Sequence, residues 1–443
     1  MTDVVAARAL TAISLAFHIV FSSIGIALPL LMVIAEGQWL RTKNQAYYNL
    51  ARKWAKAAAI LFAIGAVSGT ALSFEFGLLW PGFMKVAGGV IGLPFGLEGF
   101  AFFIEAIFIG IYLYGWDRLS PRAHWLAGLP IALAGPISGG FIVMVNAWMN
   151  SPAGFSYDPQ SGAVTNVDPI AAMFNRAWLP SVIHMTIAAY LATGIAVAAV
   201  YAWGMLKGRR DDYHRKALAI ALVITVICAP LQFISGDGNA RFVAENQTTK
   251  FAAMEGQFQT QANAPLRIGG FPDSKTGTTN FAIEIPGMLS WLGYGNTGAV
   301  VKGLNDVPLE LRPATEITHP AFQIMVGSGT ILLLVALWAL VFVWRKRRVP
   351  DGKWLLRAIL VSGPLGFIAI EAGWVLTELG RQPFIIYNVM RTADAVTTAP
   401  GLVVYLVTFV ALYLLLAAMV IWFLSRMAGE SVAREEGSSL ATA

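Results

Sequence analysis

Nine long apolar runs constrain this chain more than any other feature of its sequence. Each is long enough to cross about 30 Å of hydrocarbon as a helix. They fall at roughly residues 11–35, 54–79, 95–116, 125–149, 180–206, 216–236, 321–343, 354–378 and 402–425. Because 57% of the residues are hydrophobic and only 13% are charged, a water-soluble fold could not bury the apolar surface. The sequence therefore predicts an all-α polytopic membrane protein.

The distribution of lysine and arginine predicts the orientation of these spans. An odd number of spans places the two termini on opposite sides of the bilayer. With the N-terminus outside, 20 of the 31 Lys and Arg residues lie in segments that face the cytoplasm. Positive residues favour the cytoplasmic side, so we expect the N-terminus outside and the C-terminus inside. The net charge of +6 then reflects membrane topology and does not indicate a nucleic-acid partner.

The spans divide the chain into four predicted regions. Residues 1–236 hold six transmembrane helices, 237–320 form a long outer loop, 321–425 hold three more helices, and 426–443 are expected to be a disordered cytoplasmic tail. A loop as long as 237–320 is more often functional than a simple connection. The single cysteine, Cys228, excludes an internal disulfide, and it excludes an iron–sulfur cluster or thiolate zinc site held by this chain alone.

Several ionisable residues interrupt the apolar spans, where such groups are costly and usually functional. The ionisable residues are His18, Glu75, Glu98, Glu105, His184 and Glu371. Met325 is added to this set as a soft ligand for a metal. At 1.5 Å rise per residue, the spans place these groups in the outer half of the membrane, although the helices run in both directions. Chance would spread them over the whole depth, so we expect one outer functional region.

Imidazoles, a thioether and carboxylates in an apolar shell suit heme iron, for which His and Met form a known axial pair. Composition alone does not name the metal. Glu75 is interpreted either as a solvated residue near the surface or as part of the site. His124 and His214 lie in inner loops beside basic residues and are expected to be solvated. His319 precedes a proline and is expected to cap the seventh span.

Long motifs in these same regions resemble the heme-bearing subunit I of bacterial cytochrome bd-type quinol oxidases, including the cyanide-insensitive branch with a short quinol loop. They are AFHIVFSSIGIALPLLM at 16–32, FEFGLLWPGF at 74–83, GLEGFAFFIEAIFIGIYLYGWDRL at 96–119, TTKFAAMEG at 248–256 and EAGWVLTELGRQPF at 371–384. The resemblance covers nearly the whole chain, and the GRQP stretch is its most specific part.

The resemblance implies ligands for three hemes. His184 and Met325 are expected to be the axial pair of a low-spin heme b. His18 and Glu371 are expected to bind two high-spin hemes, a heme b and a heme d, with a third heme b in place of heme d as the alternative. Which of these two residues serves which heme stays open. Arg381, in the GRQP stretch, is expected to contact a cofactor.

The resemblance also implies roles in proton transfer. Glu98 is expected at the heme d pocket, and Glu105, with Ser138, on a route for protons from the inner side. Lys250 and Glu255 are expected at the site of quinol oxidation, where Glu255 accepts a proton and Lys250 orients a quinol oxygen. Two departures stand out. Glu98 and Glu105 are seven residues apart, where many relatives have eight. Gln323 occupies the place, two residues before Met325, where many relatives have arginine.

These expectations describe a quinol:oxygen oxidoreductase in a bacterial cytoplasmic membrane. Quinol is oxidised outside, O2 is reduced with protons from inside, and charge separates without pumping. The expected partners are a second large membrane subunit, a small single-helix subunit, quinol, O2 and the lipid bilayer. Ubiquinol and menaquinol both stay possible substrates. The alternative is a heme-free, proton-coupled membrane transporter. A heme–copper oxidase would need three copper-binding histidines and heme ligands within its spans, but two of the five histidines lie in inner loops. A diheme cytochrome b would need four histidines paired across two helices, and no such spacing occurs.

Overall fold

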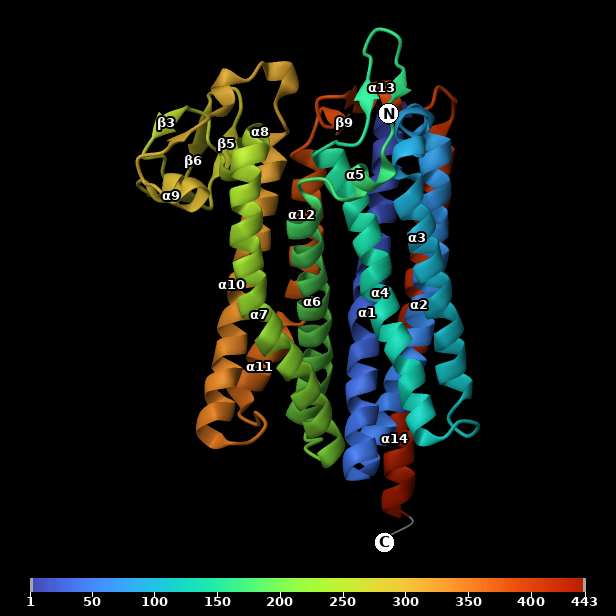
Figure 1. The fold of residues 1–443 in the computed structure, drawn as a ribbon. Helices are drawn as coiled ribbons and strands as arrows, with labels where there is room; N and C mark the ends of the chain where they lie inside the picture. Colours follow the sequence, from blue (N-terminus) through green and yellow to red (C-terminus); the bar gives the residue numbers. More distant parts are fainter. Residues whose placement is uncertain (1–2, 441–443) are drawn as a thin grey trace.

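The protein is a long bundle of membrane-spanning helices, as the sequence predicts. The computed structural model describes residues 3–440, and within them nine spans are long and apolar enough to cross a membrane. The spans are α1 (Asp3–Thr42), α2 (Gln45–Leu79), α3 (Pro81–Tyr114), α4 (Pro121–Asn150), α6 (Trp178–Leu206), α7 (Asp212–Asn246), α10 (Thr315–Lys346), α11 (Lys353–Ser362) with α12 (Leu365–Leu379), and α14 (Leu402–Leu440). Helix α1 begins at one end of the bundle and α14 finishes at the other (Figure 1).

Three of the spans begin in polar sequence, where a side chain caps the start of the helix. The side chain of Asn44 accepts a hydrogen bond from the backbone N–H of Ala46 at the start of α2. Ser120 caps α4 in the same way, directly before a proline at the first helical position. Asp211 accepts the N–H of His214 at 2.9 Å. These side chains satisfy N–H groups that a helix start otherwise leaves unpaired.

The eighth span is broken into α11 and α12 at Gly363 and Pro364, because proline cannot donate the backbone bond that a continuous helix needs. Two glycines at the break let the span approach α6 closely. A Cβ on Gly363 would lie 2.7 Å from the Cβ of Ala199, and one on Gly366 would lie 2.4 Å from the Cα of Ala192. The span thus packs directly onto the centre of the bundle, where α1 contacts α2, α4, α6 and α14.

The predicted outer loop is shorter than expected and is folded. Helix α7 continues to Asn246 and α10 begins at Thr315, so the connection comprises residues 247–314, here called the folded segment. It contains α8 (Thr248–Glu255), α9 (Met288–Tyr294) and three antiparallel strand pairs, β3 (Gln261–Ala262) with β8 (Val300–Val301), β4 (Leu266–Ile268) with β7 (Ile283–Ile285), and β5 (Phe271–Asp273) with β6 (Thr278–Asn280). Two short 3-10 turns, η1 (Leu304–Asp306) and η2 (Leu309–Leu311), complete it.

The folded segment sits on α7 and α10 at the end of the bundle where α1 begins (Figure 1); we call this the loop end. Two other connections at the loop end are shorter than the folded segment. They comprise β1 (Ser156–Tyr157), β2 (Val164–Thr165) and α5 (Pro169–Met173) before α6, and β9 (Phe384–Ile386), β10 (Met390–Arg391) and α13 (Thr392–Ala395) after α12.

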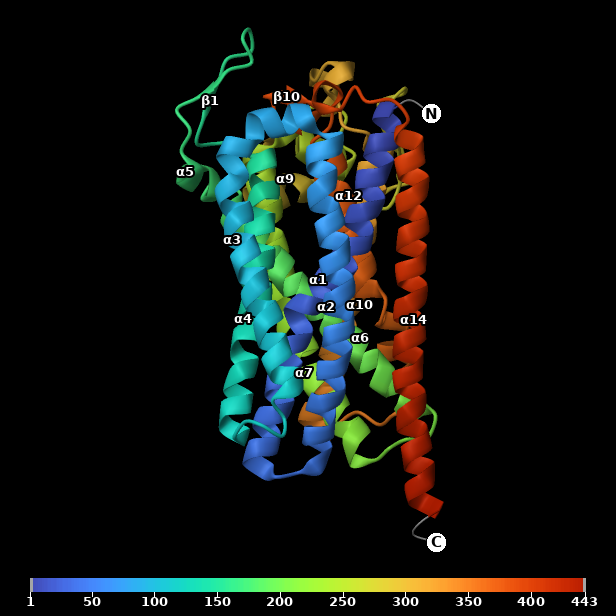
Figure 2. The ribbon, with the colours of Figure 1, turned by 90° about the vertical axis from the view of Figure 1, so that its right-hand side faces the viewer.

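Helix α14 stands at the edge of the bundle (Figure 2) and is helical as far as Leu440. This differs from the disordered tail expected from residue 426. Alanine, glutamate and arginine in this stretch favour the helix, which therefore continues beyond the apolar span. Residues 441–443 of the expected tail lie outside the described residues.

Candidate functional site

A cavity of about 430 Å³ lies among α1, α2, α3, α4, α6 and α12. It lies mainly toward the loop end, but on α3 (Pro81–Tyr114) it extends past the middle of the helix to Glu105, which is therefore deeper than the outer-half position expected from the sequence. The structure brings four of the predicted site residues to its wall, namely His18, Glu98, Glu105 and Arg381. Most of the remaining lining is apolar, with Phe, Leu, Ile, Ala and Gly side chains. A cavity with a few convergent polar groups in an apolar wall is the usual form of a cofactor site.

His18 of α1 is held in a defined orientation. Its Nδ1 lies 3.0 Å from the hydroxyl oxygen of Ser68 on α2. That hydroxyl donates to the backbone oxygen of Ile64 at 3.0 Å, so Nδ1 is the donor to Ser68 and Nε2 carries the free lone pair. A Cβ on Gly69 would lie 2.9 Å from the Cε1 of His18, so only glycine lets the ring pack there. Fixing one ring nitrogen in this way is how proteins orient a metal-binding histidine.

Glu98 and Glu105 both face the cavity from α3. Ser138 of α4 donates to Glu98 Oε1 at 3.3 Å, so this hydroxyl serves Glu98 and not Glu105, the residue with which the sequence interpretation grouped it. Glu105 is the more deeply buried of the two carboxylates. Their seven-residue separation is two helical turns, which keeps both side chains on the cavity side.

Glu75 of α2 is also buried, which decides between its two interpretations against a solvated residue. Ser14 of α1 donates to Glu75 Oε1 at 2.5 Å. The second carboxylate oxygen, Oε2, is buried and has no hydrogen-bond partner within the described residues.

Helix α12 carries two carboxylates, of which the sequence interpretation named only one. Glu371 is not part of the cavity wall, and its buried Oε1 has no hydrogen-bond partner within the described residues. Glu378, two turns later, does line the cavity. Asn146 of α4 donates to Glu378 Oε1 at 2.5 Å, and Arg381 donates to Glu378 Oε2. The seven-residue repeat within EAGWVLTELGRQPF was the signal that could have identified Glu378.

His184 and Met325 occupy two other helix contacts near the loop end. The Nδ1 of His184 lies 3.1 Å from the hydroxyl of Ser235 on α7, and the amide of Gln232 approaches its Nε2 at 3.1 Å. Met325 packs its sulfur against α12, where a Cβ on Gly373 would lie 3.0 Å from that sulfur. The glycine leaves space beside the thioether. Met325 comes from α10, which directly follows the folded segment, whereas His184 comes from α6 and contacts α7, the helix that precedes that segment.

Glu255 ends helix α8 in the folded segment. It is buried, and its Oε2 has no hydrogen-bond partner within the described residues. Burial raises the pKa of Glu255 to about 8, against the opposing effect of the Arg267 guanidinium. The next residue, Gly256, has a φ of 63°, a left-handed conformation that glycine adopts without strain. Burial thus brings the pKa of the Glu255 carboxyl close to neutral pH, which suits a group that accepts a proton.

Lys250, five residues before Glu255 on α8, is buried as well and donates to Asn150 Oδ1 at the end of α4. Burial lowers the pKa of Lys250 to about 7; the charge of Arg381 lowers it further and that of Glu378 opposes the change. The lysine therefore points from the folded segment toward the bundle.

His319 and Gln323, one turn apart on α10, anchor the folded segment. The two ring nitrogens of His319 lie 2.8 Å from Met254 O and 2.9 Å from Gly269 O. Gln323 accepts the N–H of Gly269 at 2.9 Å and donates to Arg267 O at 3.0 Å. The expectation that His319 only caps the seventh span was wrong, because its partners come from α8 and from the turn after β4. Gln323 is thus a structural link between α10 and the folded segment.

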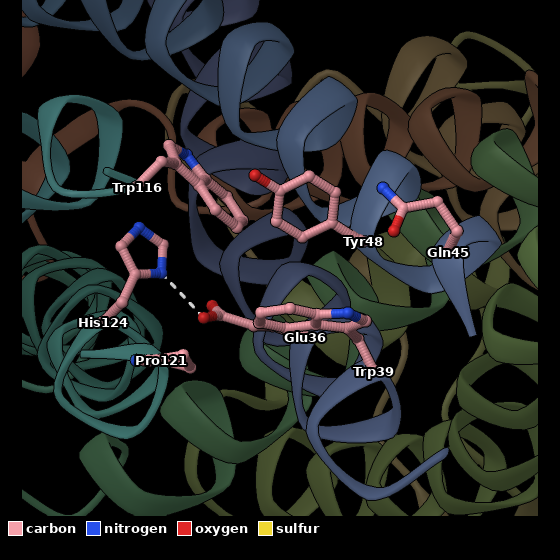
Figure 3. Close-up of a pocket in the computed structure, with 7 residues that line it drawn as sticks. All are labelled: Glu36, Trp39, Gln45, Tyr48, Trp116, Pro121 and His124. Atoms are coloured by element: carbon pink, nitrogen blue, oxygen red, sulfur yellow. Dashed lines mark hydrogen bonds and ion pairs between the residues drawn. The ribbon is translucent and has the colours of Figure 1, made fainter. Parts of the chain in front are cut away.

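A second pocket, of about 330 Å³, opens at the opposite end of the bundle (Figure 3). His124 of α4 points to Glu36 of α1, with Nδ1 2.7 Å from Oε1. Its Nε2 lies 2.8 Å from the backbone oxygen of Tyr112, whose hydroxyl donates to Glu36 Oε2 at 2.6 Å. The expectation that His124 is solvated was wrong, because a carboxylate 88 residues earlier in the chain pairs with it in the interior. His214 is likewise buried, with Nδ1 2.7 Å from Asp211 Oδ2.

The positions of these site residues indicate a class of protein without any comparison with known proteins. Histidine, methionine and carboxylates lie between the loop end and the middle of an apolar helix bundle, in or near a cavity with few polar groups. This donor set suits heme better than a closed zinc site, and no cluster of three His, Cys, Asp or Glu side chains that could hold a bare metal ion occurs among the described residues. The fold and the donors therefore indicate a membrane protein that holds redox cofactors.

Comparisons with known proteins identify the family. Residues 6–432 match the family model of cytochrome bd terminal oxidase subunit I. The chain is 39% identical over 430 residues to a putative cytochrome bd menaquinol oxidase subunit I of Bacillus subtilis, covering 96% of each chain. It is 28% identical to cytochrome bd-II ubiquinol oxidase subunit 1 of Escherichia coli, covering 95% of this chain and 94% of that protein.

A solved structure agrees with this relationship. The bd oxidase from Geobacillus thermodenitrificans superposes with a TM-score of 0.90 at 40% identity, covering 97% of this chain and 98% of that chain. The chain therefore belongs to the family of subunit I of cytochrome bd terminal oxidases. The chain is a multi-pass membrane subunit of an oxidoreductase that takes part in respiratory electron transport.

Proposed function

We propose that this chain is the catalytic subunit of a quinol oxidase of a bacterial cytoplasmic membrane. Quinol is oxidised at the folded segment, and O2 is reduced to water at the central cavity. Relatives named menaquinol and ubiquinol oxidases support this substrate class. The observation that carries the proposal is the cavity of about 430 Å³, lined by His18 and by carboxylates, next to a folded segment that presents a buried Glu255.

The residues present fit hemes. We propose two hemes b and one heme d, or a third heme b in its place, and these groups supply electron transfer and O2 reduction when bound. His184 and Met325 would hold the low-spin heme b. The free Nε2 of His18 and the close approach permitted by Gly69 suit a ligand in the cavity. Arg381 would contact a cofactor from the cavity wall.

Two carboxylates of α12 compete for the remaining ligand position, each on a different observation. Glu371, the residue implied by the family motif, has a buried oxygen with no hydrogen-bond partner within the described residues. Glu378 lines the cavity, but both of its oxygens accept hydrogen bonds. Separate Glu371→Gln and Glu378→Gln variants distinguish them, because loss of the ligand removes one high-spin heme signal from the visible spectrum. The other variant retains all hemes.

Proton transfer follows from the positions of the acids. Glu255 would accept a proton from quinol, and Lys250, whose ammonium has further N–H donors, would orient a quinol oxygen. Glu105 and Glu98 would pass protons to the cavity. With the N-terminus and the folded segment outside, quinol protons leave on one side and O2 draws protons from the other, which generates a proton motive force without pumping. We propose a second large membrane subunit and a small single-helix subunit as partners.

A reduced-minus-oxidised visible spectrum of the purified complex, with heme extraction and quinol-driven O2 uptake, tests this function. We expect three hemes and O2 uptake; a far-red band identifies heme d, and its absence together with three extractable hemes b identifies the heme-b-only form. A complex without heme would overturn the proposal. The buried carboxylates would then favour a proton-coupled transporter, which uptake measurements in vesicles with an imposed pH gradient would reveal.

A further inference from the structure

An unbroken chain of hydrogen bonds connects the folded segment to the cavity wall. Lys250 donates to Asn150 Oδ1. Asn150 Nδ2 donates to Asn146, at 2.9 Å to the backbone oxygen and at 3.3 Å to Oδ1. Asn146 Nδ2 donates to Glu378 Oε1 at 2.5 Å, and Arg381 donates to Glu378 Oε2. We call the first four residues, Lys250, Asn150, Asn146 and Glu378, the relay.

The chemistry of the two ends fixes the direction of every hydrogen bond in the relay. An ammonium can only donate and an ionised carboxylate can only accept. Asn150 must therefore present its oxygen to Lys250 and its NH2 group to Asn146. Asn146 must in turn present its NH2 group to Glu378. All the amide dipoles point the same way, from the cation to the anion, and hydrogen bonds aligned in this way polarise one another.

Burial makes the relay electrostatically effective. Lys250 and Asn150 are each 6% exposed, and the Glu378 side chain, which lines the cavity, is 30% exposed and pairs with the buried Arg381. Charges in such surroundings are weakly screened compared with charges at a surface in water. Glu378 lines the cavity directly, so a change of charge at Lys250 alters the field at any group held there.

We propose that the relay couples the charge of the quinol site to the redox state of the cavity, with Lys250 as a positioning residue for Glu378. This inference rests on the proposed function. The positive charge of Lys250 draws electron density along the relay and weakens the negative field of Glu378 in the cavity. It thereby favours the reduced, more negative state of a group bound there. Coupling between two sites is reciprocal, so electron arrival in the cavity strengthens the hold on the Lys250 proton.

Spectroelectrochemical titration of the holoenzyme tests the coupling. In Lys250→Met we expect the midpoint potentials of the cavity hemes to fall. Lys302→Met is the matched control, because Lys302 is an exposed lysine of the same folded segment and is not part of the relay. Unchanged cavity potentials in Lys250→Met, together with a raised KM for quinol, would overturn the proposal and assign Lys250 to quinol binding alone.

A second variant separates the relay from the charge of Lys250. Asn150→Ser keeps the lysine but is too short to join both neighbours, so we expect a smaller fall of the cavity potentials. In the double variant, Asn150→Ser should add nothing to the effect of Lys250→Met, because both changes break one connection. Additive shifts would show two independent effects and overturn the relay. A wild-type complex without heme would overturn the proposed function instead, before any variant is compared.

Discussion

Glu255 offers a test in which the sign and size of a pH effect follow from burial. We take the active form to have Glu255 ionised, to accept a quinol proton, and Lys250 charged, to orient the quinol oxygen. The pKa of Glu255 is raised to about 8 by burial, so its carboxylate becomes more abundant as the pH rises. The pKa of Lys250 is lowered to about 7, again chiefly by burial, so its ammonium becomes less abundant over the same range. The two requirements together predict a bell-shaped profile.

The position and height of the bell follow from these two values. At about pH 7.5 each group is in its active form in roughly one quarter of the molecules, so about one molecule in seventeen is active. At about pH 6 or pH 9 only about one in a hundred is active. The quinol kcat/KM, which reports the free enzyme, should therefore rise about sixfold from pH 6 to 7.5 and fall as much again by pH 9.

Glu255→Gln removes the ionisable acceptor with little change of shape. We expect kcat/KM to fall by about a hundredfold or more, the usual contribution of a positioned general base, and the acid limb of the profile to vanish. Steady-state O2 uptake at varied quinol concentration and pH measures both effects. Glu245→Gln, at an exposed glutamate near the end of α7, is the control and should keep the bell. An acid limb that persists in Glu255→Gln would refute the reasoning, because another group would then carry that ionisation.

Three further variants test individual contacts. His319→Ala removes the ring that bridges Met254 O and Gly269 O; loss of its hydrogen bonding should cost about 1–3 kcal/mol and lower the unfolding temperature in detergent, and an unchanged temperature would contradict the anchoring role. Gly69→Ala places a Cβ 2.9 Å from Cε1 of His18, so one high-spin heme should be lost from the visible spectrum while the low-spin heme stays. Tyr112→Phe removes the 2.6 Å bond to Glu36 and should cost about 1–3 kcal/mol in thermal unfolding, and retention of full stability would argue against a structural role for that cluster.

The spans could be predicted because hydrophobicity along the chain is a local property. Each apolar run determines its own helix, since backbone groups in lipid must be satisfied within the segment. The polar residues inside the spans could be identified for the same reason, because each stands out against its apolar neighbours in the sequence. The structure brings three of them, His18, Glu98 and Glu105, into one cavity. The ends of the spans were less predictable, because caps such as Asn44 and Asp211 extend the helices into polar sequence.

What could not be predicted depends on partners far apart in the chain. His124 stands among basic residues in the sequence, and only the fold reveals Glu36 beside it. Lys250 and Glu378 are likewise joined by two asparagines of α4 that no spacing rule selects. The strand pairs of the folded segment are two or three residues long, which is too short for an alternating pattern to stand out.

The buried carboxylates suggest why the loop end has this composition. Within the described residues, Glu75 Oε2, Glu255 Oε2 and Glu371 Oε1 are buried without a hydrogen-bond partner. An unpaired buried oxygen costs about 1–3 kcal/mol, and more when it is charged. By contrast, both carboxylate oxygens of Glu36 at the opposite end are bonded, to His124 and to Tyr112. The same chain thus pairs one buried acid completely and leaves three others incomplete. Incomplete pairing is expected where a bound group or a transferred proton completes it, and all three acids lie toward the loop end, near the cavity or in the folded segment.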